Sequence, residues 1–474
     1  MSTSSNRNRR CVAALLSATA LVGFHLGSAL AEEPEMYGSY YHDWSDWYAG
    51  VGLSGHGSLA SMDNTDFWED NGYGVYANIA RQGALGAGLA IYAGYNWQVL
   101  NRVFGLELNA EILSGHGESY FDVEDSYGWG RFQVQQKWLA SLRGRAGITV
   151  DNTLAYLTAG VAAGSIEGGL YAPERYTKSI RSGEYFGHVI GFGVEHAVHK
   201  NVNLRLEGTW TRLYTNGIER EPDNDYGEDI DFKNTDDLAV TLGIAYQFGD
   251  GGNGGSSGMS MPTRDWSGFY AGLAVSGVAS EASMDAIDFW EDNEYDSRDS
   301  YPLKQLALGA GGGVYAGYNM QRENLVYGLE ATLDIFSAQS TSGIEVVDDY
   351  SYGEFVNRTR WVGSARGRFG LAQANTLLYL AGGVAFGEVE AGIRAFEKYT
   401  KATTNDVYLG VVGGLGVEQA VKMNGKDVIL RAEGSWTRLL TGGNESFPDN
   451  DYGDEMDFDD TDIIAIKLGA ALPF

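Results

Sequence analysis

The chain repeats itself at a spacing of 222 to 226 residues, and this duplication limits its possible folds more than any other feature. The segment Tyr-Ala-Gly at 48–50 returns at 270–272, and Arg-Gly-Arg at 143–145 returns at 366–368. Further matches follow in the same order through both halves. A repeat of this length is one structural unit used twice. We therefore expect two copies of a single fold.

Within each copy, apolar residues alternate with small or polar residues in eight stretches, the pattern of a β-strand with two different faces. In the last stretch of the first copy, Leu242, Ile244 and Tyr246 fall on one face, while Gly243 and Ala245 fall on the other. One face suits lipid and the other suits a narrow interior. The predicted strands are 47–59, 84–98, 103–114, 137–149, 154–166, 185–198, 202–213 and 236–248, then 269–280, 308–321, 326–337, 361–371, 376–388, 406–421, 427–439 and 462–474.

The connections between these strands alternate in length. Short turns occupy 99–102, 150–153 and 199–201, whereas the connections on the other rim are long, polar and acidic. This arrangement is typical of an outer-membrane barrel, with periplasmic turns and external loops. We therefore expect an all-β fold of two tandem eight-stranded antiparallel transmembrane up-and-down β-barrels, with one sixteen-stranded barrel as the alternative. The predicted long loops of the first copy are 60–83, 115–136, 167–184 and 214–235.

The ends of the chain and the join between the copies predict the remaining segments. Residues 1–31 have a basic start, an apolar stretch and small residues before a cleavage site, as a secretory signal peptide does. Residues 32–248 then form the first barrel, 249–264 a Gly/Ser-rich periplasmic linker, and 265–474 the second barrel. Loss of the signal removes the single cysteine and three arginines, leaving a net charge of −33. Such acidity disfavours nucleic acid as a partner.

Charges of both signs occur on the polar faces of the middle strands of both copies. An arginine that faced lipid at the midplane would cost about 2–4 kcal/mol, so we expect these side chains to point inward. Eight strands leave an interior that side chains just fill, and arginines paired with carboxylates would plug it. A charged constriction in an open channel is the alternative. The predicted interior network comprises Glu107, Glu111, Arg143, Arg145, Glu195, Arg205 and Glu207, then Glu330, Asp334, Arg366, Arg368, Glu418, Arg431 and Glu433.

Aromatic residues gather near the predicted strand ends, where their rings suit the headgroup region of a bilayer. The expected partners are accordingly outer-membrane lipid and lipopolysaccharide. The last strand ends in Phe474, and this resembles the signal by which the outer-membrane assembly machinery recognises its clients. The residues assigned to the aromatic belt are Trp44, Trp47, Tyr48, Tyr95, Trp97, Trp266 and Phe269.

Little in the sequence supports catalysis. Barrel enzymes of the outer membrane generally need a histidine beside a serine or carboxylate, yet all seven histidines lie at or before His199. The second copy therefore cannot repeat a histidine-dependent active site, and we expect no enzyme and no cofactor. His56 and His116, in matching Ser-Gly-His-Gly segments, are candidates for haem or metal binding. The acidic segments 223–229 and 449–454 are interpreted as solvated surface, with no metal site.

Several short motifs resemble a known family. Trp-Ser-Gly-Phe-Tyr-Ala-Gly at 266–272, Gly-Phe-Gly-Val-Glu at 191–195 and Asp-Tyr-Gly in the last loop are similar to the small eight-stranded outer-membrane β-barrel proteins of alphaproteobacteria, known as porin-family proteins or surface antigens. The resemblance implies a structural surface protein in the outer membrane of a Gram-negative bacterium, displaying long acidic loops. The alternatives are a porin or small-solute channel and, since haemin binding is claimed for some relatives, a haemin- or metal-binding receptor.

Overall fold

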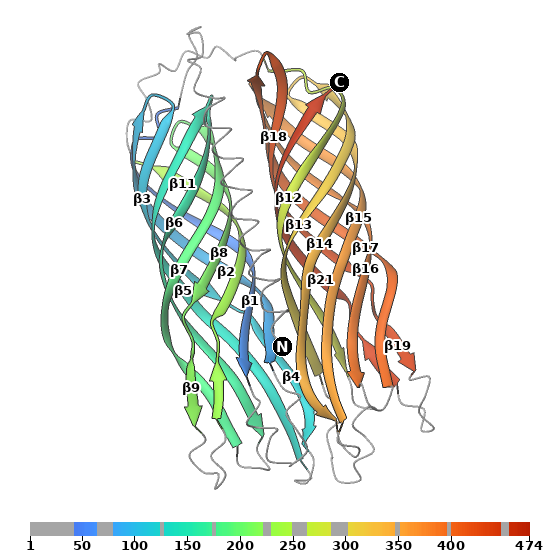
Figure 1. Ribbon diagram of the computed structural model, residues 1–474. Helices are drawn as coiled ribbons and strands as arrows, with labels where there is room; N and C mark the ends of the chain where they lie inside the picture. Colours follow the sequence, from blue (N-terminus) through green and yellow to red (C-terminus); the bar gives the residue numbers. More distant parts are fainter. Residues whose placement is uncertain are drawn as a thin grey trace.

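The computed structural model describes ten segments of the chain, which form 21 β-strands and no helix (Figure 1). In these segments, accordingly, no helix is long and apolar enough to cross a membrane. The signal peptide predicted for 1–31 and most of the predicted linker lie outside the described residues. The described segments are 42–63, 79–123, 128–172, 177–220, 229–248, 263–285, 302–346, 351–395, 400–446 and 455–474.

The strands of the first copy pair in one closed antiparallel cycle. The cycle has eight positions, and in three of them the strand is interrupted by a short break. These positions contain β3 with β4, β8 with β9, and β10 with β11. The cycle closes between the first and last strands, where Tyr48 pairs with Gln247 and Leu59 pairs with Asp236. The strands are β1 (Asp46–Asp63), β2 (Ile79–Val99), β3 (Arg102–Leu113), β4 (His116–Val123), β5 (Gly128–Val150), β6 (Thr153–Ala172), β7 (Thr177–His199), β8 (Val202–Leu213), β9 (Gly217–Arg220), β10 (Asp229–Phe232) and β11 (Thr235–Gln247).

The second copy repeats this pairing. Its cycle closes between β12 and β21, where Tyr270 pairs with Pro473. The predicted all-β, antiparallel class is therefore confirmed, and each cycle closes within its own copy (Figure 1). The strands are β12 (Gly268–Asp285), β13 (Pro302–Arg322), β14 (Leu325–Val346), β15 (Ser351–Gln373), β16 (Thr376–Ala395), β17 (Thr400–Met423), β18 (Lys426–Leu439), β19 (Gly443–Ser446), β20 (Glu455–Phe458) and β21 (Thr461–Pro473).

The predicted external loops are too long, because the strands continue into them. β5 begins at Gly128 rather than at 137, and β7 begins at Thr177 rather than at 185. A β-bulge lies between Gln136 and Trp138, at the point where the predicted strand began. A bulge shifts the alternation by one residue. Beyond the bulge the outer face of the strands meets water instead of lipid. The backbone hydrogen bonds between strands therefore continue, but the outward residues no longer need to be apolar.

The aromatic belt holds for some residues and is wrong for others. Trp47, Trp97 and Phe269 project outward and are 61%, 49% and 65% exposed. In contrast, Trp44 and Trp266, at the start of each copy, are buried at the barrel ends, and Tyr48 is buried in the interior. Tyr48 follows the outward Trp47, so alternation turns it toward the interior. The position of an aromatic near a strand end thus does not by itself assign it to the lipid side.

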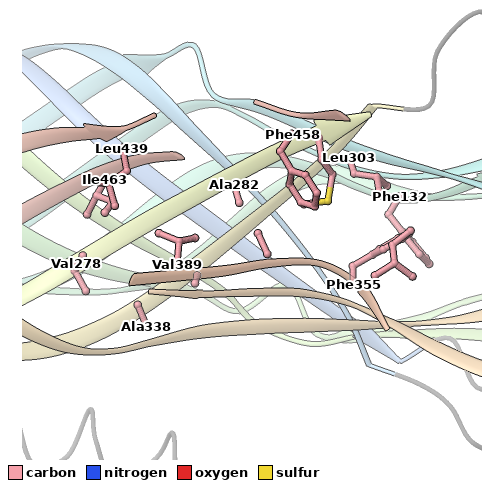
Figure 2. Close-up of a cluster of buried hydrophobic side chains, with 14 of the residues drawn as sticks. Phe132, Val278, Ala282, Leu303, Ala338, Phe355, Val389, Leu439, Phe458 and Ile463 are labelled. Atoms are coloured by element: carbon pink, nitrogen blue, oxygen red, sulfur yellow. The ribbon is translucent and has the colours of Figure 1, made fainter. Parts of the chain in front are cut away.

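The interior of each barrel has two layers. Near the periplasmic turns it contains charged side chains and tyrosines, whereas toward the external ends it contains an apolar cluster (Figure 2). Phe132 and Phe355, from β5 and β15, are almost completely buried in this cluster. Glu107 of the charged layer lies between Leu106 and Leu108, which are 54% and 63% exposed. The charged layer therefore lies at the level of the exposed apolar residues of the outer face.

Candidate functional site

The charged layer of the first barrel is built by cross-strand register. Glu107 on β3 lies directly opposite Arg143 on β5, and Glu195 on β7 lies opposite Arg205 on β8. Opposite charges in facing positions of neighbouring strands stabilise the pairing. The remaining members come from the same strands two residues away, so that alternation points all six side chains to one interior. The six are Glu107, Arg143, Arg145, Glu195, Arg205 and Glu207.

These six groups form one connected ion-pair network. Arg205 Nη2 lies 2.6 Å from Glu107 Oε2, and its Nε lies 2.9 Å from Glu195 Oε1. Arg145 Nη2 lies 2.7 Å from the same Glu195 oxygen, and Arg143 Nη1 lies 2.7 Å from Glu207 Oε1. Arg143 also contacts Glu107. Three guanidinium groups and three carboxylates therefore compensate one another away from water, as buried charges require.

Three tyrosines complete the network, and the sequence reasoning did not include them. Tyr48 Oη donates to Glu107 Oε2 at 2.8 Å, and Tyr156 Oη donates to Glu207 Oε2 at 2.6 Å. The Arg205 guanidinium lies 3.9 Å from the centre of the Tyr92 ring, which favours the cation. Both copies place a tyrosine at each of these positions. That repetition, on the face that alternation assigns to the interior, could have revealed them.

The second barrel contains the equivalent network. Arg366 Nη1 lies 2.7 Å from Glu433 Oε1, and Arg368 Nη2 lies 2.9 Å from Glu418 Oε1. Arg431 connects Glu418 with Glu330, as Arg205 connects its two glutamates. The tyrosines are Tyr270, Tyr315 and Tyr379.

Two predicted members lie four residues further along the same strands, outside the six-residue clusters. Glu111 accepts a hydrogen bond from Ser54 Oγ. Its counterpart Asp334 instead contacts Lys467 Nζ at 2.5 Å, an ion pair that the sequence reasoning missed. Thr241 occupies the position equivalent to Lys467 in the first copy, so the two barrels differ in charge at this level.

The two candidate histidines lie on opposite sides of the barrel wall. His56 is completely buried, with Nδ1 3.3 Å from Asp237 Oδ2. The side chain of His116 is 47% exposed and lies 3.6 Å from Glu118. A haem or metal ion therefore cannot reach both imidazoles at once. Within the described residues, no group of three or more potential metal ligands occurs, and most of the acidic segments 223–229 and 449–454 lies outside them.

Comparison with known proteins identifies the family. The family described as "Outer membrane protein beta-barrel domain" matches residues 16–250. A "22 kDa outer membrane protein" of Rhizobium leguminosarum bv. viciae is 33% identical over 163 residues, which are 34% of this chain and 67% of that protein. The chain belongs to this outer-membrane β-barrel family of alphaproteobacteria. Membership places it in the outer membrane of a Gram-negative bacterium.

Two further known proteins are less similar to the chain. The "31 kDa outer-membrane immunogenic protein" of Brucella melitensis biotype 1 is 28% identical over 167 residues, which are 35% of this chain and 68% of that protein. The solved structure of neisserial surface protein A is 13% identical with a TM-score of 0.24, covering 43% of this chain and 97% of that one. The barrel family is thus assigned by sequence and not by this structural similarity.

Proposed function

We propose that this family member is a structural surface protein composed of two barrels that do not conduct solutes. The observation that carries the proposal is the closed network of three arginines and three glutamates in each barrel, none of whose side chains is more than 4% exposed. Eight strands leave little space beyond the side chains themselves. The strands extend past the membrane band, and the segments that follow them at the external end are rich in acidic residues.

The single-channel conductance of the purified full-length chain in planar bilayers tests this proposal. We expect no large, stable open steps for the wild type. The Arg205→Ala and Arg431→Ala double variant removes the connecting guanidinium from both networks and should increase the frequency of openings. Its matched control, Arg212→Ala with Arg438→Ala, removes equivalent arginines that pair with Asp236 and Asp462 near the external rim. Stable open steps from the wild type would show that the lumens are pores.

The geometry also argues against catalysis and haemin binding. Ser58 Oγ donates to Asp237 at 2.7 Å, and Asp237 in turn contacts His56. The serine is therefore bound to the carboxylate, whereas a catalytic nucleophile would be oriented toward the imidazole.

Haemin binding is opposed by the burial of His56, because the barrel wall encloses its ring. Haemin titration of the wild type and the His56→Ala and His116→Ala variants should give equal, non-saturating absorbance changes.

We further propose that the terminal aromatic residue is read during assembly. Phe474 is 79% exposed, and its backbone N–H donates to Phe269 O at 2.8 Å, which fixes the chain end at the barrel seam. Phe474→Ala should reduce the amount of folded protein in the outer membrane of an expressing cell. Phe248→Ala, at the equivalent position of the first copy, is the control and should have a smaller effect. Equal losses would contradict the assignment.

A further inference from the structure

The wall of each barrel is incomplete at the same place. The ladder between β2 and β3 ends at the Gly88–Leu113 pair, and the ladder between β13 and β14 ends at the Gly311–Phe336 pair. β2 and β13 both continue for nine more residues toward the external end. Over these residues the described register pairs β2 with no residue of β4, and β13 with no residue of β14. The edges of these strand segments therefore need other hydrogen-bond partners.

A serine closes each ladder where it stops. Ser114 Oγ accepts from Ala87 N at 3.1 Å and donates to Ala87 O at 2.9 Å. Ser337 makes the same two bonds to Ala310, at 3.1 Å and 3.0 Å. Ser114 and Ser337 occupy equivalent positions, 223 residues apart, as do Ala87 and Ala310. The interruption is therefore a repeated feature of the fold.

The other copy contacts both strand segments beyond the interruption. Ser119 Oγ on β4 accepts from Lys304 N at 3.2 Å and donates to Lys304 O at 3.1 Å. In reverse, Ser342 Oγ on β14 accepts from Arg81 N at 2.8 Å and donates to Arg81 O at 2.9 Å. These four residues form two equivalent pairs, so each copy satisfies backbone groups of the other in the same way. Leu303 also pairs with Ser119 across the two cycles.

Glycines bring the outer faces of the barrels together in the same reciprocal pattern. A Cβ on Gly208 would lie 2.6 Å from Ile466, and a Cβ on the equivalent Gly434 would lie 2.8 Å from Val240, the counterpart of Ile466. Small residues at such positions let apolar barrel walls approach closely inside a membrane. At the periplasmic turns, Thr153 Oγ1 lies 3.0 Å from Thr376 Oγ1, its own counterpart.

Toward the external end, the two barrels share one apolar core. A single cluster of buried residues includes Met62 and Phe132 of the first copy with Leu303 and Phe355 of the second (Figure 2). Figure 2 shows Phe132 beside Leu303, which lies on the strand segment beyond the interruption of β13. Neither copy encloses this core by itself.

We propose that each copy carries a docking face for the other, so that the chain is a covalently linked, pseudo-twofold dimer of barrels. Reciprocal contacts between equivalent residues are the mark of an isologous interface. The face runs from Ser119 and Gly83 at the external end, through Gly57 and Gly208, to Thr153 at the periplasmic end. A Cβ on Gly83 would clash with Leu306, and one on Gly57 would lie 2.7 Å from Ala279, both in the second copy. Its occupant is the equivalent face of the second copy within the same chain.

Disulfide trapping in the full chain tests the arrangement. The Thr153→Cys and Thr376→Cys double variant places two thiols within bonding reach, because the parent oxygens are 3.0 Å apart. A protease site inserted in the segment 253–258 allows the folded chain to be cut. On a denaturing gel without reductant, the disulfide should hold the two halves of the cut protein together, so that they migrate as one band at the size of the full chain. With reductant, the halves should migrate as two separate bands. The control pair is Val161→Cys with Val384→Cys, equivalent residues that are 62% and 57% exposed, and should not crosslink within one chain.

Co-purification of the cut halves provides an independent readout that needs no disulfide. In mild detergent, a tag on one wild-type half should retain the other. Gly208→Leu with Gly434→Leu should reduce that retention at least several-fold, while each half keeps the heat-modifiable gel mobility of a folded barrel. Gly144→Leu with Gly367→Leu should leave it unchanged, because both positions are exposed and an added Cβ would meet only one backbone oxygen, at 3.8 Å. Halves that separate in the wild type, or crosslinks that appear only between different chains, would overturn the proposal.

Discussion

At the residue scale, Arg205 shows why the interior charges act as a unit. Its guanidinium contacts two glutamates and lies over a tyrosine ring, and the residue is almost completely buried. Arg205→Leu leaves Glu107 and Glu195 buried with fewer positive partners, and removing one member of a buried pair costs about 3–5 kcal/mol. Arg212→Leu breaks a half-exposed pair with Asp236 and should cost about 1 kcal/mol or less. Urea titration of the folded protein in lipid vesicles measures both free energies of unfolding, and equal values would contradict the network.

His42, at the periplasmic end, should make the free energy of unfolding depend on pH. Burial lowers its pKa below the ordinary value of 6.5, although the hydrogen bond to Gln247 opposes this shift. A lowered folded-state pKa means that protons bind the unfolded chain more readily. The contribution is therefore complete above about pH 6.5 and is lost as the pH falls through this value toward the folded pKa. The difference in free energy of unfolding between wild type and His42→Gln should decrease between pH 8 and pH 5.5. A constant difference would exclude the effect.

At the scale of elements, interior tyrosines require glycines on the facing strands. A Cβ on Gly243 of β11 would lie 2.6 Å from Tyr92 Oη, closer than two such atoms approach. Overpacking of this kind costs typically about 1–3 kcal/mol. Gly243→Ala should therefore destabilise the barrel by about this amount, whereas Gly413→Ala, with no atom within 4 Å of the added carbon, should not. Urea midpoints of the two variants decide between these expectations, and identical midpoints would contradict a filled lumen.

The strands of the membrane region could be predicted from sequence because one face meets lipid and the other a filled interior. Alternation places Arg143 and Arg145 on one face, and the cost of an arginine that faces lipid, about 2–4 kcal/mol, assigns that face to the interior. Beyond the bulge at Gln136 the outward positions become polar and the alternation shifts by one residue, so the sequence pattern predicts loops where the strands in fact continue. The interface between the copies was also missed. Gly208 and Val240 show the same apolar alternation whether lipid or another barrel covers them.

At the scale of the whole molecule, the outer surface changes character with height. β5 has 23 residues, so it extends over roughly 75 Å along its axis, whereas the apolar band of such a barrel is only about 25 Å tall. Leu142 and Val161 project outward into that band, and Lys137 on β5 instead pairs with Glu167 at 3.2 Å. The bilayer boundary on the external side must therefore lie between Leu142 and Lys137.

This boundary can be located by chemistry, because the single cysteine lies in the predicted signal peptide. In lipid vesicles, a membrane-impermeant maleimide should label Lys137→Cys rapidly and Leu142→Cys at least tenfold more slowly, since lipid covers the latter thiol. The equivalent pair in the second copy, Arg360→Cys and Ala365→Cys, should differ in the same direction. In detergent-free urea, all four thiols should react alike, which controls for intrinsic reactivity. Equal labelling of Lys137→Cys and Leu142→Cys in vesicles would place the boundary elsewhere, and with it the charged layer relative to the membrane.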